Sequence, residues 1–113
     1  SWPKSEPHAA HDTRAMLYEL RTYTLVPGGL RDYLQRYEEA GRAVQVELLG
    51  HLVALMQPES GDQNQLLFLW GFDSFEERRQ RRQKLLADER FTAFRKSVRH
   101  LLISQDSRLL NPA

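Results

Sequence analysis

The sequence feature that most constrains the fold is the run of residues 66–72, which reads LLFLWGF. Successive side chains of a β-strand point to opposite faces of its sheet, and this run places large apolar residues on both faces. Such a strand must be covered on both sides. One side can pack against helices of the same chain, and in a short chain the other side is best covered by a second copy. The run therefore predicts a homodimer that forms through the open face of a sheet.

The length and composition of the chain limit the classes of protein that it can form. A chain of 113 residues makes one domain. Its 16 Lys and Arg nearly balance its 15 Asp and Glu, which argues against a nucleic-acid-binding protein. The chain has no cysteine, which excludes disulfides and thiolate catalysis and fits a reducing compartment. No apolar run approaches the roughly 20 residues that span a membrane.

Residues 1–15 differ from the rest of the chain, because they contain two prolines and two histidines but hardly any apolar periodicity. We interpret them as an N-terminal extension, either native or added for expression. Residues 16–113 are expected to form the folded domain.

The remaining pattern predicts the order strand, helix, strand, strand, helix, helix, strand. The expected strands are residues 17–26, 51–56, 66–72 and 104–110, and the expected helices are residues 30–46, residues 75–87 and a third that Asp88 caps. This order predicts a ferredoxin-like α+β fold, in which a four-stranded antiparallel sheet carries helices on one face. On the first strand, we expect the helices to cover the set Tyr18, Leu20, Thr22, Thr24 and Val26.

A series of short motifs closely resembles the NIPSNAP family from residue 16 to the end of the chain. The motifs are ELRTYTL at residues 19–25 with Pro27-Gly28, Gly61 and Asn64 ahead of Leu69-Trp70, Glu77-Arg78 with Arg82, and Asp88 ahead of Phe91. The resemblance implies subunits that pair sheet to sheet as a dimeric α/β barrel. It also implies a cytoplasmic location for a bacterial protein, or a mitochondrial one for a eukaryotic protein. The wider superfamily includes cofactor-independent monooxygenases, haem-degrading enzymes and polyketide cyclases, so the fold alone assigns no activity.

Glu19, Arg21 and Tyr23 share one face of the first strand, where they could line a polar cavity inside the barrel. Tyr23 would donate a proton to a developing oxyanion, and Arg21 would hold an anionic group of a ligand. The alternative is a structural ion pair in which Glu19 satisfies an arginine.

Arg82 falls on the stripe of its helix where an apolar residue is expected. A buried guanidinium requires a partner, so we expect Arg82 and Arg78 to pair with Glu19 or with a backbone carbonyl. The alternative is that Arg82 reaches an anionic ligand. The other basic residues of the run 78–84 are interpreted as a solvent-exposed helix face rather than a nucleic-acid site.

His51 is the candidate catalytic base, and Trp70 could line a hydrophobic pocket or simply pack in the core. The sequence contains no phosphate-binding glycine loop and no paired metal motif, so we expect no cofactor and no metal. We therefore expect a small homodimeric barrel that binds a small hydrophobic or anionic molecule or serves as an accessory module. The alternative is an enzyme of the cofactor-independent monooxygenase or cyclase type.

Overall fold

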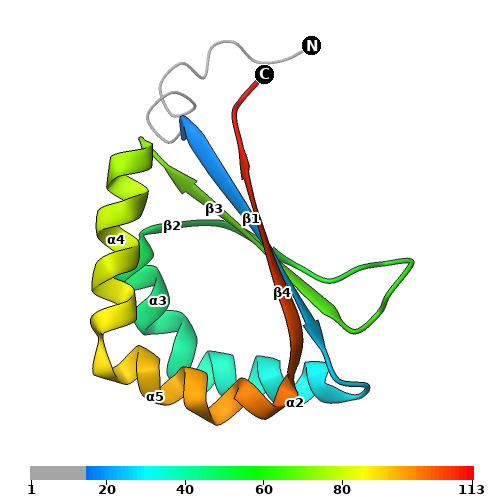
Figure 1. Ribbon diagram of the computed structural model, residues 1–113. Coiled ribbons are helices and arrows are strands. Elements are labelled where there is room, and N and C mark those ends of the chain that lie inside the picture. Colours follow the sequence, from blue (N-terminus) through cyan, green and yellow to red (C-terminus); the bar gives the residue numbers. More distant parts are fainter. Residues whose placement is uncertain (1–14) are drawn as a thin grey trace, which may run out of the picture.

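The computed structural model describes residues 15–113, so the N-terminal extension lies outside the described residues except for Ala15 (Figure 1). The elements are β1 (Leu17–Leu25), α2 (Gly29–Arg36), the π-helix η1 (Tyr37–Gly41), α3 (Arg42–Leu49), β2 (His51–Met56), β3 (Gln65–Phe72), α4 (Phe75–Ala87), α5 (Glu89–Val98), the 3-10 helix η2 (Arg99–Leu101) and β4 (Leu102–Leu110). The predicted order of strands and helices is confirmed.

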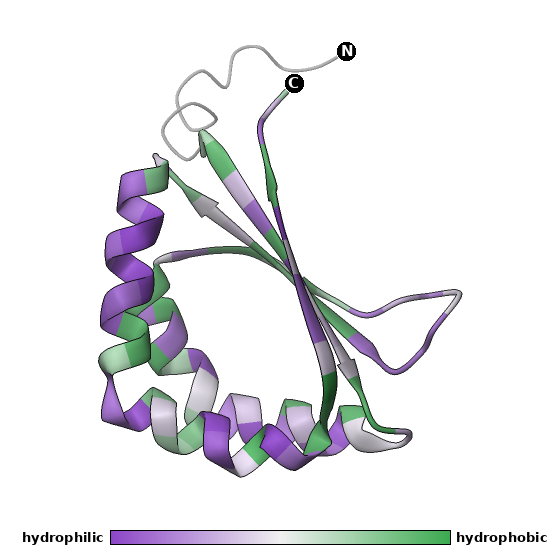
Figure 2. Ribbon diagram, in the orientation of Figure 1, coloured by the Kyte–Doolittle hydropathy of each residue, from purple (hydrophilic) through white to green (hydrophobic). Residues whose placement is uncertain are grey.

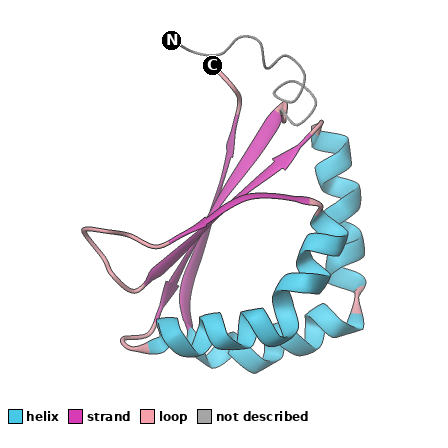
Figure 3. Cartoon of the chain, turned by 180° about the vertical axis from the view of Figure 1, so that it is seen from behind, coloured by secondary structure: helices cyan, strands magenta, loops and turns pink. Residues whose placement is uncertain are grey.

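The four strands form one antiparallel sheet in the order β2-β3-β1-β4, with β1 between β3 and β4. All the helices lie on the same side of this sheet (Figures 1 and 3). We call the sheet face toward the helices the inner face and the opposite one the outer face. This arrangement confirms the predicted ferredoxin-like α+β fold. No described helix combines the length and the apolar character that crossing a membrane requires.

The hydrophobic core lies between the inner face and the helices. On β3, the alternating residues Leu66, Phe68, Trp70 and Phe72 are buried there. On β1, the buried residues are Leu17, Glu19, Tyr23 and Leu25. The predicted faces of β1 are therefore wrong, because the set that contains the charged residues faces the helices. Glu19 can lie there because arginines from β1 and α4 neutralise its carboxylate.

The outer face carries the other set of residues of each strand. Leu67 and Leu69 of β3 lie there, and their neighbours in the sheet are Thr22 and Leu20 of β1 on one side and Met56 and Ala54 of β2 on the other. No helix of residues 15–113 covers this face (Figure 3). Within one subunit, β3 thus buries one face and leaves apolar side chains on the other, as the LLFLWGF run predicts, while the homodimer stays a prediction.

The first helical region is bent rather than continuous, which differs from the single helix predicted over residues 30–46. The π-helix η1 separates α2 from α3, and the chain changes direction there (Figure 1). Gly41 ends η1 and is buried against α5. A Cβ atom at this position would lie 2.8 Å from the ring of Tyr37 and 2.9 Å from that of Phe94. Glycine therefore permits the close packing of η1 on α5.

Local capping defines the starts of the two C-terminal helices as the sequence predicts. At the start of α4, Ser74 accepts a hydrogen bond of 3.0 Å from the amide of Glu77, and the Glu77 carboxylate reaches back to the amide of Asp73 at 2.6 Å. At the start of α5, Asp88 accepts from the amides of Arg90 and Phe91. Figure 2 shows that α4 is hydrophilic over most of its length, as expected for a largely exposed basic helix.

Candidate functional site

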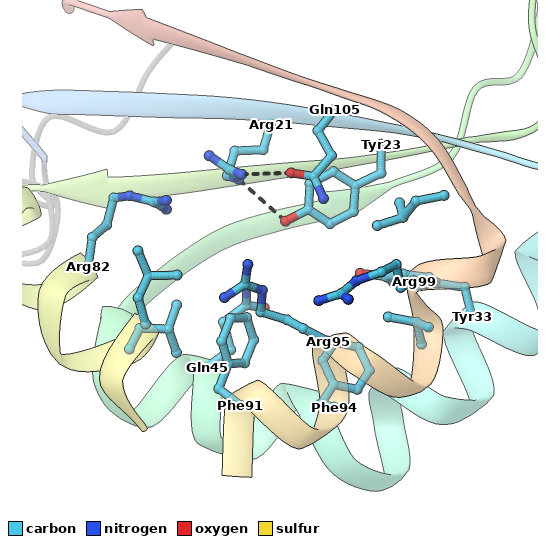
Figure 4. A pocket seen from close by; sticks show the side chains of 14 residues that line it. Arg21, Tyr23, Tyr33, Gln45, Arg82, Phe91, Phe94, Arg95, Arg99 and Gln105 are labelled. Carbon is cyan, nitrogen blue, oxygen red and sulfur yellow. Dashed lines mark hydrogen bonds between the residues drawn. The ribbon is translucent and has the colours of Figure 1, made fainter. Parts of the chain in front are cut away.

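A cavity of about 350 Å³ lies between the inner face of the sheet and the helices (Figure 4). This volume is within the usual range for sites that hold small molecules. Every helical segment except η1 contributes to its wall, together with β1 and β4. The cavity is lined by three residues that the sequence analysis proposes for the site, namely Arg21, Tyr23 and Arg82. It is also lined by two residues that the sequence analysis does not propose, Gln45 and Gln105.

Glu19 lies beside this cavity and connects three elements. Its side chain is 1% exposed. Arg78 of α4 donates to both carboxylate oxygens at 2.9 and 3.0 Å, Arg21 donates at 3.0 Å, and Ser107 of β4 donates at 2.5 Å. Burial raises the pKa of Glu19, but the hydrogen bonds from Arg78, Ser107 and Arg21 outweigh this effect and lower the pKa to about 2. The structural ion pair considered from the sequence is thus present, and Arg78 is its main partner.

Arg21 is held in place by hydrogen bonds along its whole guanidinium group. Besides its contact with Glu19, its Nε donates to the Tyr23 hydroxyl at 3.3 Å and its Nη2 donates to Oε1 of Gln105 at 3.4 Å (Figure 4). Its guanidinium carbon also lies 5.7 Å from the centre of the Tyr23 ring. These contacts fix Arg21, Tyr23 and Gln105 relative to one another at the sheet side of the cavity.

Arg82 reaches from α4 toward the sheet side of the same cavity (Figure 4). It is partly buried, and within residues 15–113 it has no hydrogen-bond or ion-pair partner. The predicted pairing of Arg82 with Glu19 is therefore wrong, because Arg78 and Arg21 occupy that carboxylate. Burial and the neighbouring positive charge of Arg21 lower the pKa of Arg82. Arg82 is thus a partly desolvated cation without a carboxylate partner in the described chain.

Gln45 is a buried polar residue of α3 that sequence reasoning missed. It is 4% exposed, and its Oε1 accepts a hydrogen bond of 2.5 Å from the hydroxyl of Tyr37. A regular helical pattern gave no signal for it, because the π-helix η1 changes which side chains of this region share a face. Gln105 gave no signal either, because β4 alternates too weakly for its inner face to be recognised.

His51 and Trp70 do not join this group. His51 is exposed and pairs with Gly71, which places it on the outer face of the sheet, away from Tyr23. Trp70 is fully buried in the core beside Phe68 and does not line the cavity. Its indole Nε1 has no hydrogen-bond partner among the described residues. Tyr23, His51 and Trp70 therefore do not share one pocket within one subunit.

Two further arginines lie at the helix side of the cavity. Arg95 of α5 and Arg99 of η2 line it, although both are largely exposed. The Arg95 guanidinium lies 6.0 Å from the centre of the Phe91 ring, a distance that permits a cation–π contact. No three His, Asp or Glu side chains of residues 15–113 come together in a way that could hold a metal ion.

Comparisons with other proteins agree with this architecture. The NIPSNAP family model matches residues 18–113. A NIPSNAP family protein of unknown function from Agrobacterium tumefaciens is 35% identical, with 89% of this chain and 91% of that chain covered and a TM-score of 0.84. A NIPSNAP-like domain protein from Burkholderia xenovorans is 33% identical, with 86% and 84% covered and a TM-score of 0.83. A search of curated proteins finds no match.

A more distant likeness extends to the fold alone. A proposed antibiotic biosynthesis monooxygenase from Nitrosomonas europaea is 6% identical, with 88% of this chain and 92% of that chain covered and a TM-score of 0.65. The shared fold does not transfer an activity. The family match spans the whole described domain after its first residues, and two solved relatives exceed 30% identity over most of the chain. The chain therefore belongs to the NIPSNAP family.

Proposed function

We propose that this NIPSNAP protein is a small-molecule-binding module whose cavity holds an organic anion with an apolar body. The observation that carries the proposal is Arg82, a partly buried guanidinium at the cavity wall with no carboxylate partner within residues 15–113. A desolvated cation gains from an anionic partner, and a ligand carboxylate can accept two hydrogen bonds from one guanidinium.

The charges around the cavity support an anionic ligand. Arg21, Arg78 and Arg82 lie close enough to influence one another, and Glu19 is the carboxylate that balances them. One negative charge among three positive charges leaves an excess of positive charge. Among residues 15–113, no Asp or Glu lines the cavity wall itself. A bound anion would therefore offset the burial and the repulsion from Arg21 that lower the pKa of Arg82.

The apolar part of the wall suits the body of such a ligand. The cavity is lined by Leu85 of α4 and by Phe91, Phe94 and Val98 of α5. Phe91 and Phe94 lie across the cavity from Arg21 (Figure 4). Aromatic and aliphatic walls with a few convergent polar groups are typical of small-molecule sites. The wall is thus suited to a flat or branched hydrocarbon body with its charge toward Arg82.

The proposal includes a homodimer that forms through the outer face, in a cytoplasmic location. Leu20, Leu67 and Leu69 are apolar side chains of this face that no described helix covers. Burying each such side chain fully is worth about 1.5–3 kcal/mol, which favours pairing with the same face of a second subunit. The absence of cysteine favours a reducing compartment.

The test is mass spectrometry of small molecules that the purified native protein retains. We expect a retained anion that is lost in Arg82→Ala. The matched control is Arg79→Ala, because Arg79 lies on the same helix but pairs with the exposed Glu76 away from the cavity. Retention of the same molecules by both variants would contradict the proposal, and so would a native protein that carries no anion and binds none.

A second candidate function is a cofactor-independent monooxygenase or cyclase that uses the same cavity. The observation that favours it is the Tyr23 hydroxyl, which accepts a hydrogen bond from Arg21 and keeps its own proton for donation. In such an enzyme Tyr23 would protonate an oxyanion that develops on the substrate, while Arg21 orients it. Tyr23→Phe would then bind the retained molecule but fail to convert it. A binding module would instead show no conversion in either protein.

A further inference from the structure

We infer that the ligand of this cavity is an acceptor-only organic anion: a carboxylate whose other polar group is a ketone or carboxylate oxygen, with no amine or ammonium group. This inference rests on the proposed function, because it specifies the chemistry of the same cavity. It comes from the hydrogen bonds inside the wall, which use the acceptor atoms and leave donors free.

The two glutamines of the wall have their oxygen atoms occupied. Oε1 of Gln45 accepts from Tyr37 at 2.5 Å, and Oε1 of Gln105 accepts from Arg21 at 3.4 Å. The amide nitrogens of both residues have no hydrogen-bond partner within residues 15–113. Gln45 is only 4% exposed, so the free N–H groups of its amide have little access to solvent except through the cavity. Gln45 therefore presents a buried donor to a ligand, and the exposed Gln105 can present a second one.

The other polar side chains of the cavity wall also offer mainly hydrogen-bond donors. Four arginines, at positions 21, 82, 95 and 99, supply only donors, and the described part of the chain places no carboxylate on the cavity wall. The hydroxyls of Tyr23 and Tyr33 can donate as well as accept, and the oxygen of Tyr23 already accepts from Arg21. A ligand amine would lose its hydrogen bonds to water and find few acceptors in exchange. Oxygen acceptors on a ligand would instead satisfy the free amide groups.

Tyr37 determines which end of the Gln45 amide faces the cavity. Tyr37 is buried beneath the cavity wall and does not line it. Its hydroxyl holds the amide oxygen of Gln45, so the amide nitrogen must take the other direction. Without that hydroxyl, the amide can rotate and offer its oxygen to a ligand donor. Tyr37 is thus a positioning residue for ligand selectivity, although it does not touch the ligand.

The experiment is a titration of the full chain by NMR with four probes of similar shape. The probes are 4-acetylbenzoate, which adds an acceptor, 4-aminobenzoate, which adds a donor, 4-isopropylbenzoate, which adds neither, and the uncharged 4-acetylbenzyl alcohol. We expect 4-acetylbenzoate to bind about three- to tenfold tighter than the amino and isopropyl probes, the value of one matched hydrogen bond. In Tyr37→Phe, this advantage over 4-aminobenzoate should fall to about twofold or less.

The control variant is Tyr18→Phe, which removes a phenol oxygen from a residue of the outer face and should keep the wild-type selectivity. If Tyr37→Phe fails to fold, Gln45→Met gives the same test, because it removes the amide and should erase the preference for the acetyl probe. The inference is overturned if the carboxylates bind but 4-aminobenzoate binds as well as 4-acetylbenzoate, or if neither variant changes that ratio. If the alcohol binds as tightly as the carboxylates, or if no probe binds, the proposed anion site itself is wrong.

Discussion

Replacing Glu19 by glutamine should destabilise the protein strongly at neutral pH and much less at acidic pH. In the folded protein the pKa of Glu19 is lowered from 4.5 to about 2. One pKa unit corresponds to about 1.4 kcal/mol, so the ionised carboxylate contributes about 3 kcal/mol at pH 7. Because the folded pKa is the lower one, this stabilisation is complete above pH 4.5 and is lost as the pH falls toward 2. About 1.4 kcal/mol should remain at pH 3.

The assay is urea unfolding of wild type and Glu19→Gln at pH 7 and pH 3, at one fixed protein concentration. The difference in unfolding free energy between the two proteins should shrink by about 2 kcal/mol at the lower pH. The matched control is Glu76→Gln, which removes an exposed carboxylate paired with Arg79 and should show a much smaller change with pH. Equal destabilisation by Glu19→Gln at both pH values would refute the reasoning, because the effect would then not depend on the charge.

Three further predictions concern packing, capping and assembly. Gly41→Ala should destabilise the protein by about 1–3 kcal/mol in thermal unfolding, because its methyl group would collide with the rings of Tyr37 and Phe94. A wild-type melting temperature would contradict this. Ser74→Ala should cost about 1 kcal/mol in the same assay, since α4 loses its N-cap, and an unchanged stability would argue against that cap. Leu69→Glu should halve the mass measured by light scattering at micromolar concentration, whereas a wild-type mass would place the dimer interface elsewhere.

The local patterns of the sequence were sufficient for the order of elements but not for the faces of β1. Alternation divides β1 correctly into two sets, yet the choice between the sets depends on partners elsewhere in the chain. Glu19 and Arg21 read as polar positions, so the opposite set was expected against the helices. Arg78, 59 positions along the sequence, neutralises Glu19, and Ser107, 88 positions along, donates a hydrogen bond to it. This long-range pairing reverses the preference for water that the residue types suggest.

Only part of the candidate site could be predicted from the sequence. Arg82 was recognisable as a functional candidate because a cation stood where an apolar residue was expected. Arg21 and Tyr23 were recognisable because they share one face of the first strand with Glu19. His51 was misplaced, because a histidine near the start of a strand gives no indication of which sheet face it occupies. Gln45 depends on the π-helix η1, whose extra residue per turn changes which side chains of the helix share a face. A regular helical pattern cannot predict that change.

The most direct test of the anion-binding cavity is a crystal structure of the protein grown with 4-acetylbenzoate. We expect the carboxylate within hydrogen-bond distance of the Arg82 guanidinium and the aromatic ring beside Phe91. A probe bound elsewhere, or bound in the cavity with its carboxylate turned away from Arg82, would contradict the proposed function.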